Sequence, residues 1–244
     1  MRTAVITGGT GEIGLSIARK LLSEGLVVAL IGSSIVSAEK AEDLIEEYPD
    51  QCSFWVCNLR NPEKIYSCIK EIYEATGSID ILVNCAGVLE SDIPEDLTEE
   101  VWDEVIDVNL KSYFFAIQSC LPYLKNGKLP RIVNVSSNAG RMGGYANGSA
   151  YAASKGGVIS LTYNLARRLA KFGITVNCVA PGTIESEMIQ LLPIEVKQSL
   201  IDKFPVGRFG TGSEIASAVN YFVMENSSFT TGAVLDVNGG LFMG

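Results

Sequence analysis

The chain has 244 residues, of which 47% are hydrophobic and 19% charged, and its net charge is −9. This composition describes a globular chain that can bury one sizeable core, and the acidic charge disfavours broad contact with nucleic acid or anionic membranes. The complete absence of histidine excludes Ser-His-Asp triads and histidine-based zinc sites. Any proton transfer must therefore use Tyr, Lys, Asp, Glu or Cys.

The chain carries no marker of membrane insertion, export or metal binding. Its longest apolar stretch, Leu26 to Ile31, is far shorter than the ~20 residues that span a bilayer. The first residues, Met1 to Thr7, contain no long apolar region or cleavage site. Six scattered cysteines form no CxxC pair, so we expect reduced thiols and no metal site. We expect a cytoplasmic protein with a single domain over residues 1–244.

Apolar runs rich in Val and Ile alternate along the chain with stretches of helical period, which indicates βαβ units around a parallel sheet. The runs are continuously apolar, as burial on both faces requires. The predicted fold is α/β, a single-domain doubly wound parallel sheet of the Rossmann-like type with about seven strands and helices on both faces. The expected strands are Thr3–Thr7, Val27–Ile31, Cys52–Cys57, Ile79–Asn84, Arg131–Ser136, Thr175–Val179 and Val234–Val237.

Capping signals predict where several helices begin. Asn61-Pro62-Glu63 supplies a cap, a first-turn proline and an acid, and Thr98 starts a long helix that continues through Leu121. Another helix is expected from near Ser149 to Ala170, and Thr211 opens a late one that runs to about Met224. Residues 182–205 are the least patterned, and we expect them to form a substrate lid beyond the carboxyl ends of the strands.

The stretch TGGTGEIG follows the first strand and opens a helix, which is the context of a dinucleotide fingerprint. Gly9, Gly11 and Gly14 fit G-x-G-x-x-G, and Glu12 occupies a variable position. At ~6 Å from a phosphate, its charge would cost about 3 kcal/mol at a dielectric of 20 but under 1 kcal/mol in water. A solvent-facing Glu12 is tolerable and a buried one is not; a glycine turn without any ligand is the alternative. The residues expected to bind pyrophosphate are Gly8, Gly9, Thr10, Gly11, Glu12, Ile13 and Gly14.

Tyr151 and Lys155 are i and i+4 on one predicted helix and therefore share a face. A nearby ammonium favours the phenolate, so we expect the pKa of Tyr151 to be lowered toward neutrality. In a chain without histidine this is the best acid/base pair available. On spacing alone, such a pair is most often a solvated helix face.

The motifs together resemble the short-chain dehydrogenase/reductase family over essentially the whole chain. They arrive in the order of that family: Asn84-Cys85-Ala86-Gly87, then Asn109, Ser137, Tyr151 with Lys155 in the YxxxK spacing, Pro181-Gly182 and Asn238-Gly239-Gly240. The opening loop instead has the TGxxGxxG spacing of the extended members of the family. The resemblance implies an NAD(P)-dependent enzyme that acts on CH–OH or C=O groups.

By this resemblance Tyr151 protonates the carbonyl oxygen, and Ser137 orients that oxygen, with Ser136 as an alternative one residue away. Lys155 also holds the nicotinamide ribose, and Asn109 supports a water relay to Lys155. The residues implied to contact substrate are Ser137, Tyr145, Tyr151 and Met188.

The end of the second predicted strand, Gly32-Ser33-Ser34, carries no carboxylate to bind the ribose hydroxyls of NAD. NADP(H) is therefore favoured and NAD(H) remains possible, because Gly11 stands where some NADP-dependent members carry an arginine. By the same resemblance, Asn58 matches the position that faces the adenine, with a cap at the end of the strand as the alternative. The other residues implied to bind cofactor are Leu59, Asn84, Ala86, Gly87, Tyr151, Lys155, Pro181, Gly182 and Ile184.

The overall spacing is most similar to the 3-oxoacyl-[acyl-carrier-protein] reductase branch, which implies reduction of 3-oxoacyl thioesters carried on acyl carrier protein or coenzyme A. Basic residues could form a landing patch for an acidic carrier, although Phe172 stands where that branch usually has a base. A dehydrogenase of a sugar, polyol or other secondary alcohol and a catalytically silent dinucleotide-binding protein are the alternatives. The resemblance also implies a homotetramer. The basic residues are Lys125, Lys128, Arg131, Arg167, Arg168 and Lys171.

Overall fold

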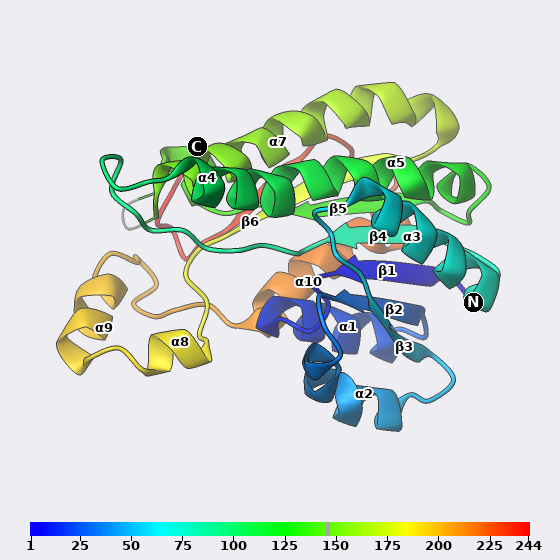
Figure 1. Ribbon diagram of the computed structural model, residues 1–244, viewed down its shortest axis with the longest axis horizontal. Helices are drawn as coiled ribbons and strands as arrows, with labels where there is room; N and C mark the ends of the chain where they lie inside the picture. Colours follow the sequence, from blue (N-terminus) through cyan, green and yellow to red (C-terminus); the bar gives the residue numbers. More distant parts are fainter. Residues whose placement is uncertain (145–146) are drawn as a thin grey trace.

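The chain folds around one parallel sheet, seen edge-on in the computed structural model of Figure 1. The structure describes residues 1–144 and 147–244, excepting the side chains of residues 187 and 188. Within this part the sheet has seven strands in the order β3-β2-β1-β4-β5-β6-β7. The strands are β1 Thr3–Thr7, β2 Val27–Gly32, β3 Cys52–Val56, β4 Ile81–Asn84, β5 Arg131–Val135, β6 Thr175–Pro181 and β7 Val234–Val237.

All seven predicted strands and the doubly wound parallel sheet are confirmed. The predicted ends were wrong by one or two residues at five strands. β2 and β6 run further, to Gly32 and Pro181, where they still pair with β3 and β7. β3 and β5 end one residue earlier than predicted and β4 begins at Ile81. Apolar pattern marks the buried middle of a strand and leaves its ends weakly defined.

The connecting helices begin where the capping signals predict. Asn61 accepts hydrogen bonds from the first-turn amides of α3, Thr98 caps α4, and Thr211 with Glu214 forms a capping box on α10. The helices are α1 Glu12–Ser23, α2 Glu42–Glu47, α3 Pro62–Thr76, α4 Glu99–Ile106, α5 Ser112–Leu124, α6 Ala139–Met142, α7 Ser149–Leu169, α8 Glu187–Gln190, α9 Ile194–Ile201 and α10 Gly212–Val223, with short 3-10 turns at Val36–Ala41, Ala170–Phe172 and Glu225–Ser227. None of the helices in the described residues is both long and apolar enough to cross a bilayer.

Two buried cores cover the two faces of the sheet. Ala4 and Ile6 of β1 belong to the core that α1 and α10 close, whereas Val5 belongs to the core beneath α3 and α5. This alternation follows from the two-residue period of a strand. Burial on both faces explains why the strands are continuously apolar.

The long helix predicted from Thr98 is interrupted by a π-helical segment, Asp107–Lys111, between α4 and α5. Single-turn π segments occur frequently at functional sites. Here the segment carries Asn109, which is buried.

Helices α8 and α9 lie apart from the sheet, beyond the carboxyl ends of its strands (Figure 1). They belong to the segment 182–205 that was predicted as a lid. A bridge between Ile184 and Gly210 joins the base of this segment to the chain before α10.

Candidate active site

Two cavities open at the carboxyl ends of the strands. The strand order reverses between β1 and β4, which is the switch point where doubly wound sheets bind ligands. One cavity has a volume of about 470 Å³ and the other of about 590 Å³. They share Gly8, Ala86, Gly87 and Val88 in their walls. Two chambers that meet at a glycine loop match the two halves of a dinucleotide on either side of its pyrophosphate.

The glycine loop packs closely against neighbouring backbone, and at two of its positions there is no space for a side chain. Gly8 has a φ of +65°, and a Cβ there would lie 2.6 Å from the Cα of Ala86. A Cβ on Gly14 would lie 2.3 Å from the carbonyl oxygen of Gly8. Gly11 is under no such constraint, and Glu12 next to it is exposed. The cradle fits a pyrophosphate, and the charge of Glu12 faces solvent, where it costs little.

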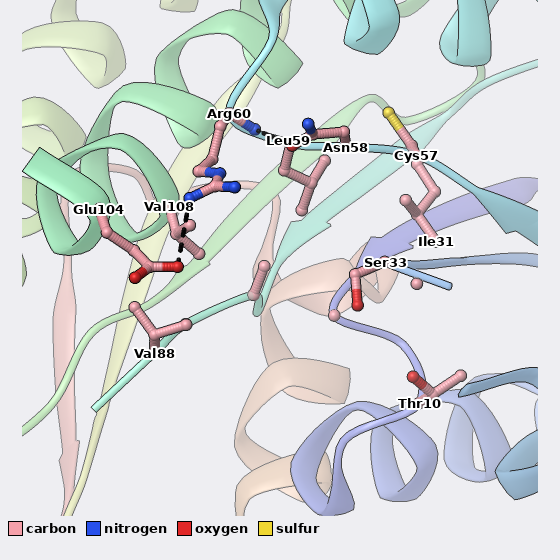
Figure 2. Close-up of a pocket in the computed structure, with 14 residues that line it drawn as sticks. Thr10, Ile31, Ser33, Cys57, Asn58, Leu59, Arg60, Val88, Glu104 and Val108 are labelled. Carbon is pink, nitrogen blue, oxygen red and sulfur yellow. Dashed lines mark hydrogen bonds and ion pairs between the residues drawn. The ribbon is translucent and has the colours of Figure 1, made fainter. Parts of the chain in front are cut away.

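Figure 2 shows the smaller cavity, whose walls come from the ends of β2, β3 and β4, from α4 and from the π-helical segment that follows it. Ser33 and Asn58 are its uncharged polar residues at the ends of β2 and β3, and Leu59 and Val108 add apolar wall. Among the described residues, its only charged lining groups are Arg60 and Glu104. These two form an ion pair of 3.3 Å between partly exposed side chains.

The larger cavity brings together Ser137, Tyr151 and Lys155. Ser137 follows β5, and the other two lie on the first turns of α7. The neighbouring Ser136 also lines the cavity, but its hydroxyl donates to the carbonyl oxygen of Lys155 at 2.7 Å and so holds α7 to β5. The Ser137 hydroxyl instead donates to Asn138 Oδ1 at 3.0 Å and accepts from the amide of Ala139 at 3.1 Å. Its proximity to the phenol of Tyr151 opposes the larger effect of burial on the pKa of that group.

Lys155 lies deep in the site, with only 4% of its surface exposed. Its Nζ donates to the carbonyl oxygen of Val135 at 3.0 Å and to the hydroxyl of Tyr113 at 3.4 Å. Burial lowers the pKa of this ammonium to about 8, against a smaller opposing effect of Cys85 and Cys178. These two contacts therefore hold the Lys155 ammonium in place. The ammonium loses its proton near pH 8, which is within the pH range in which enzymes are assayed.

The expected lowering of the pKa of Tyr151 was wrong for this structure. Burial raises the pKa of the phenol, and the Ser137 hydroxyl only partly offsets that effect. Lys155 aims its Nζ at Val135 and Tyr113, and this atom lies 5.9 Å from the centre of the Tyr151 ring. The phenol is consequently kept protonated, as a proton donor must be.

Asn109 lies behind the cavity and does not line it. Its Oδ1 accepts from the amide of Val88 at 2.8 Å, and its Nδ2 donates to the carbonyl oxygen of Val88 at 2.9 Å and to Ser154 Oγ at 3.2 Å. A Cβ on Gly87 would lie 3.4 Å from Asn109 Oδ1 and 3.5 Å from Lys155 Nζ. Asn109 thus joins the loop after β4 to the helix that carries Tyr151.

Most of the residues predicted to bind cofactor line one of the two cavities. Gly9 is buried beneath the loop, Ser34 turns back to bond Ser37, and Asn84 donates to Asn134 inside the sheet. The structure does not bring these three, or Pro181, into either cavity. The predicted cofactor residues that do line a cavity are Gly8, Thr10, Gly11, Glu12, Ile13, Gly14, Ser33, Asn58, Leu59, Ala86, Gly87, Tyr151, Lys155, Gly182 and Ile184.

Of the predicted substrate residues, Tyr145 and the side chain of Met188 lie outside the described residues. The described wall of the larger cavity is apolar at Leu89, Ile184 and Ile189. Ile189 belongs to α8, so the predicted lid contributes to this wall.

One residue of the predicted basic landing patch was wrong, and the basic end of α7 lies far from the larger cavity. Arg131 is fully buried and donates to the carbonyl oxygen of Pro130, so it offers no charge to a partner. Arg167 and Arg168 lie in the last turn of α7, about 24 Å along the helix from Tyr151. Lys125 and Lys171 pack on Phe172 at that same end.

Three charged residues near the cavities were not predicted from sequence. Arg60 directly follows Asn58-Leu59, and the rule that ligands bind beyond strand ends could have indicated it. Glu104 comes from α4, and Glu90 is a buried carboxylate beside the start of α7. No spacing in the sequence links either of them to the site.

The switch-point cavities, the glycine cradle and the Ser137, Tyr151 and Lys155 group define a dinucleotide-dependent oxidoreductase that acts on carbonyl and hydroxyl groups. The comparisons with known proteins agree with this class. The chain belongs to the short chain dehydrogenase family, whose model matches residues 2–195.

Among curated proteins, the chain is 39% identical over 247 residues to 3-oxoacyl-[acyl-carrier-protein] reductase FabG of Staphylococcus aureus, covering 99% of this chain and 98% of the relative. It is 37% identical over 242 residues to the protein of the same name from Aquifex aeolicus, covering 99% and 97%. A solved structure, the crystal structure of gox2181, superposes with a TM-score of 0.93 at 30% identity and covers 98% of this chain and 95% of that one. The resemblance found in the sequence is thereby confirmed.

Proposed function

We propose that this protein is an NADP(H)-dependent reductase of 3-oxoacyl thioesters, which it converts to 3-hydroxyacyl thioesters. The observation that carries the proposal is the larger cavity, where Ser137, Tyr151 and Lys155 face a wall of apolar side chains. The relatives named as 3-oxoacyl-[acyl-carrier-protein] reductases support the choice of substrate.

The residues divide the reaction between binding and proton transfer. A bound nicotinamide would supply the hydride that reaches the carbonyl carbon. Ser137 donates a hydrogen bond to the carbonyl oxygen and orients it, and Tyr151 transfers its phenolic proton to that oxygen, giving the alcohol. The buried Lys155 ammonium stabilises the phenolate that Tyr151 leaves behind, and it would hold the nicotinamide ribose.

Asn109 supports the site from behind. Its two bonds to Val88 fix the wall that faces the dinucleotide, while its bond to Ser154 fixes the position of α7. A proton relay through water that passes Asn109 and Lys155 would return a proton to the Tyr151 phenolate after each turnover.

The preference for NADP(H) rests on the smaller cavity. Ser33 lines it at the end of β2, where a carboxylate would bind the ribose hydroxyls of NAD and repel a 2′-phosphate. Asn58 lies at the end of the neighbouring strand, where its Oδ1 accepts from the amide of Arg60 at 3.1 Å and caps the strand end, and its Nδ2 would be available to donate to a ring nitrogen of the adenine.

We further propose that the protein is a cytoplasmic homotetramer. Trp102, Phe114 and Tyr163 are partly exposed aromatic residues on α4, α5 and α7, and we propose that these helices pair the subunits. The cysteines are unpaired throughout, which suits a reducing compartment. Light scattering on the purified protein tests the assembly, and a monomeric mass would contradict it.

The acyl group could be carried by coenzyme A or by an acyl carrier protein. A carrier docked on the basic end of α7 would sit about 24 Å along the helix from Tyr151 of the same chain. A carrier docked there would have to bridge that distance to deliver its thioester to the cavity of the same chain.

The proposal is tested by following the absorbance of NADPH with a short 3-oxoacyl coenzyme A thioester, against sugars and polyols with NADP⁺ or NAD⁺ as oxidant. Turnover of the thioester with NADPH preferred over NADH is expected. Faster oxidation of a polyol would establish the alcohol dehydrogenase instead. Dinucleotide binding without turnover of any of these substrates would indicate a catalytically silent member of the family, and failure to bind either dinucleotide would refute the proposal.

A further inference from the structure

Helix α7 carries Tyr151 and Lys155, yet its N-terminus has no cap of its own. The N-cap residue is Gly148, and no side chain there accepts from the first-turn amides. A helix start left without such partners exposes unsatisfied N–H groups, and here that start lies in the wall of the active site. The partner must therefore come from another part of the chain.

Glu90 supplies that partner from the loop after β4. Its backbone carbonyl oxygen accepts from the amide of Gly148 at 2.9 Å, and its carboxylate Oε2 accepts from the amide of Tyr151 at 3.3 Å. Tyr151 is the third residue of the helix, the position whose amide a capping side chain normally satisfies. The negative charge also lies at the positive end of the helix dipole.

Gly148 and Glu90 are fitted to each other. A Cβ on Gly148 would lie 1.6 Å from Glu90 Oε1, so any other residue there would displace the carboxylate. The backbone of Gly148 is extended, with φ −74° and ψ 173°, and would accept any residue. Glycine is therefore required at position 148 because a side chain there would occupy the space of the Glu90 carboxylate.

The arrangement is an expensive way to cap a helix. Glu90 is 5% exposed, and its Oε1 has no hydrogen-bond partner among the described residues. A serine or aspartate at position 148 would cap α7 without burying a distant carboxylate. What Glu90 adds is a connection between two elements that a local cap would not join.

The connection runs between the wall of the cofactor site and the proton donor. Gly87 and Val88 line both cavities, and Leu89 lines the larger one. Asn109 joins Val88 to Ser154 of α7, and Glu90 joins the end of the same short loop to Tyr151. The loop is thus tied to the catalytic helix at two points.

We propose that Glu90 is a positioning residue, which sets the place of Tyr151 relative to the loop that faces the cofactor. The inference rests on the proposed carbonyl chemistry of Tyr151. It assigns to Glu90 no contact with substrate and no proton transfer.

The test compares Glu90→Ala with Thr211→Ala, which removes the cap of α10. Loss of either cap is expected to lower Tm by about 2–4 °C. Glu90→Ala is also expected to lower kcat by about 10- to 100-fold with little change in KM, because small displacements of a reacting group are costly. Thr211→Ala should leave kcat within about twofold. Equal kcat values for the two variants would overturn the proposal.

Two further variants separate positioning from folding. Glu90→Gln keeps an acceptor for the Tyr151 amide and should restore most of kcat. Gly148→Ala should reproduce the defect of Glu90→Ala, and the double variant should be no worse than either single one, because both remove the same contact. Additive losses, or a Glu90→Gln variant as slow as Glu90→Ala, would contradict the assignment.

A readout without turnover keeps this inference separate from the proposed function. Hydrogen exchange should show loss of protection at the first turn of α7 in Glu90→Ala and none at α10. Unchanged protection at Tyr151 would overturn the role of Glu90 even in an active enzyme. A wild-type protein that turns over no carbonyl substrate would instead refute the proposed function.

Discussion

Two buried carboxylates flank strand β4 and do different work. Asp80, just before the strand, is 1% exposed, and Glu90, in the loop after it, is 5% exposed. Asp80 accepts from the amides of Thr3 and Lys128 and from the hydroxyl of Ser78. The carboxylate of Glu90 accepts from the Tyr151 amide alone, and its other oxygen is without a partner in the described structure.

This contrast separates an end of the sheet that stabilises the fold from an end that carries the chemistry. At the amino end, Asp80 joins the start of β1 to the turn before β5 and satisfies backbone donors that would otherwise be orphaned. At the carboxyl end, polar groups are buried with fewer partners and with shifted pKa values, as Lys155 and Tyr151 show. Changes at the amino end should therefore alter stability, and changes at the carboxyl end should alter turnover.

The largest effect is expected for Tyr151→Phe, which removes the proton donor from the carboxyl end. We expect kcat to fall by about 10²- to 10⁴-fold, the usual contribution of a general acid. Dinucleotide affinity should change little. Tyr163→Phe, a partly exposed tyrosine on the same helix, is the matched control and should be fully active. Activity retained by Tyr151→Phe would assign the proton donor elsewhere.

At the amino end of the sheet, Asp80→Ala should lower stability and leave turnover unchanged. Removing a buried acceptor of three donors should lower the free energy of unfolding by about 3 kcal/mol. The folded protein should keep its kcat, because Asp80 lies at the opposite end of β4 from the cavities. Urea unfolding and steady-state kinetics measure both quantities, with the exposed Asp92→Ala as control. A loss of kcat without a loss of stability would contradict the assignment of a purely structural role to Asp80.

A smaller and selective effect is expected for Ser33→Asp in the cofactor cavity. The new carboxylate would repel a 2′-phosphate, so affinity for NADPH should fall about tenfold while affinity for NADH is kept. Ser34→Asp places the same charge one residue further on, outside the cavity wall, and should do less. Fluorescence titration with both dinucleotides measures the difference, and an equal loss for both would contradict the NADP(H) assignment.

Near neutral pH, the smallest change is expected from pH itself. Carbonyl reduction needs a protonated Tyr151, whose pKa burial raises, and a charged Lys155, whose pKa burial lowers to about 8. The proton on Lys155 is present below this value and lost above it, so kcat/KM should be level from about pH 6 to 7, fall to about half near pH 8 and then decrease up to about tenfold per pH unit. Intrinsic fluorescence confirms folding across the range. A profile that stays level to pH 10 would exclude a role for the Lys155 charge.

Much of the fold and part of the site could be predicted because the signals were local. Strand β1, the glycine turn after it and the cap at Asn61 each depend on a few adjacent residues. The spacing of Tyr151 and Lys155 likewise places both on one helix face. Ser34 and Asn84 were predicted on position in a motif, and the structure turns them away from the cavities, because a motif does not state where a side chain points.

The alternation of strands and helices, the glycine cradle, the Tyr-Lys pair and the absence of imidazole chemistry all follow from the order of residues along the chain. The burial that lowers the pKa of Lys155, the pairing of Arg60 with Glu104 and the capping of α7 by Glu90 arise only when the chain packs. Those features join residues 44 or more positions apart in the chain or depend on how deeply a group is buried. Neither distance in space nor solvent access is encoded in local spacing, so only the packed chain reveals them.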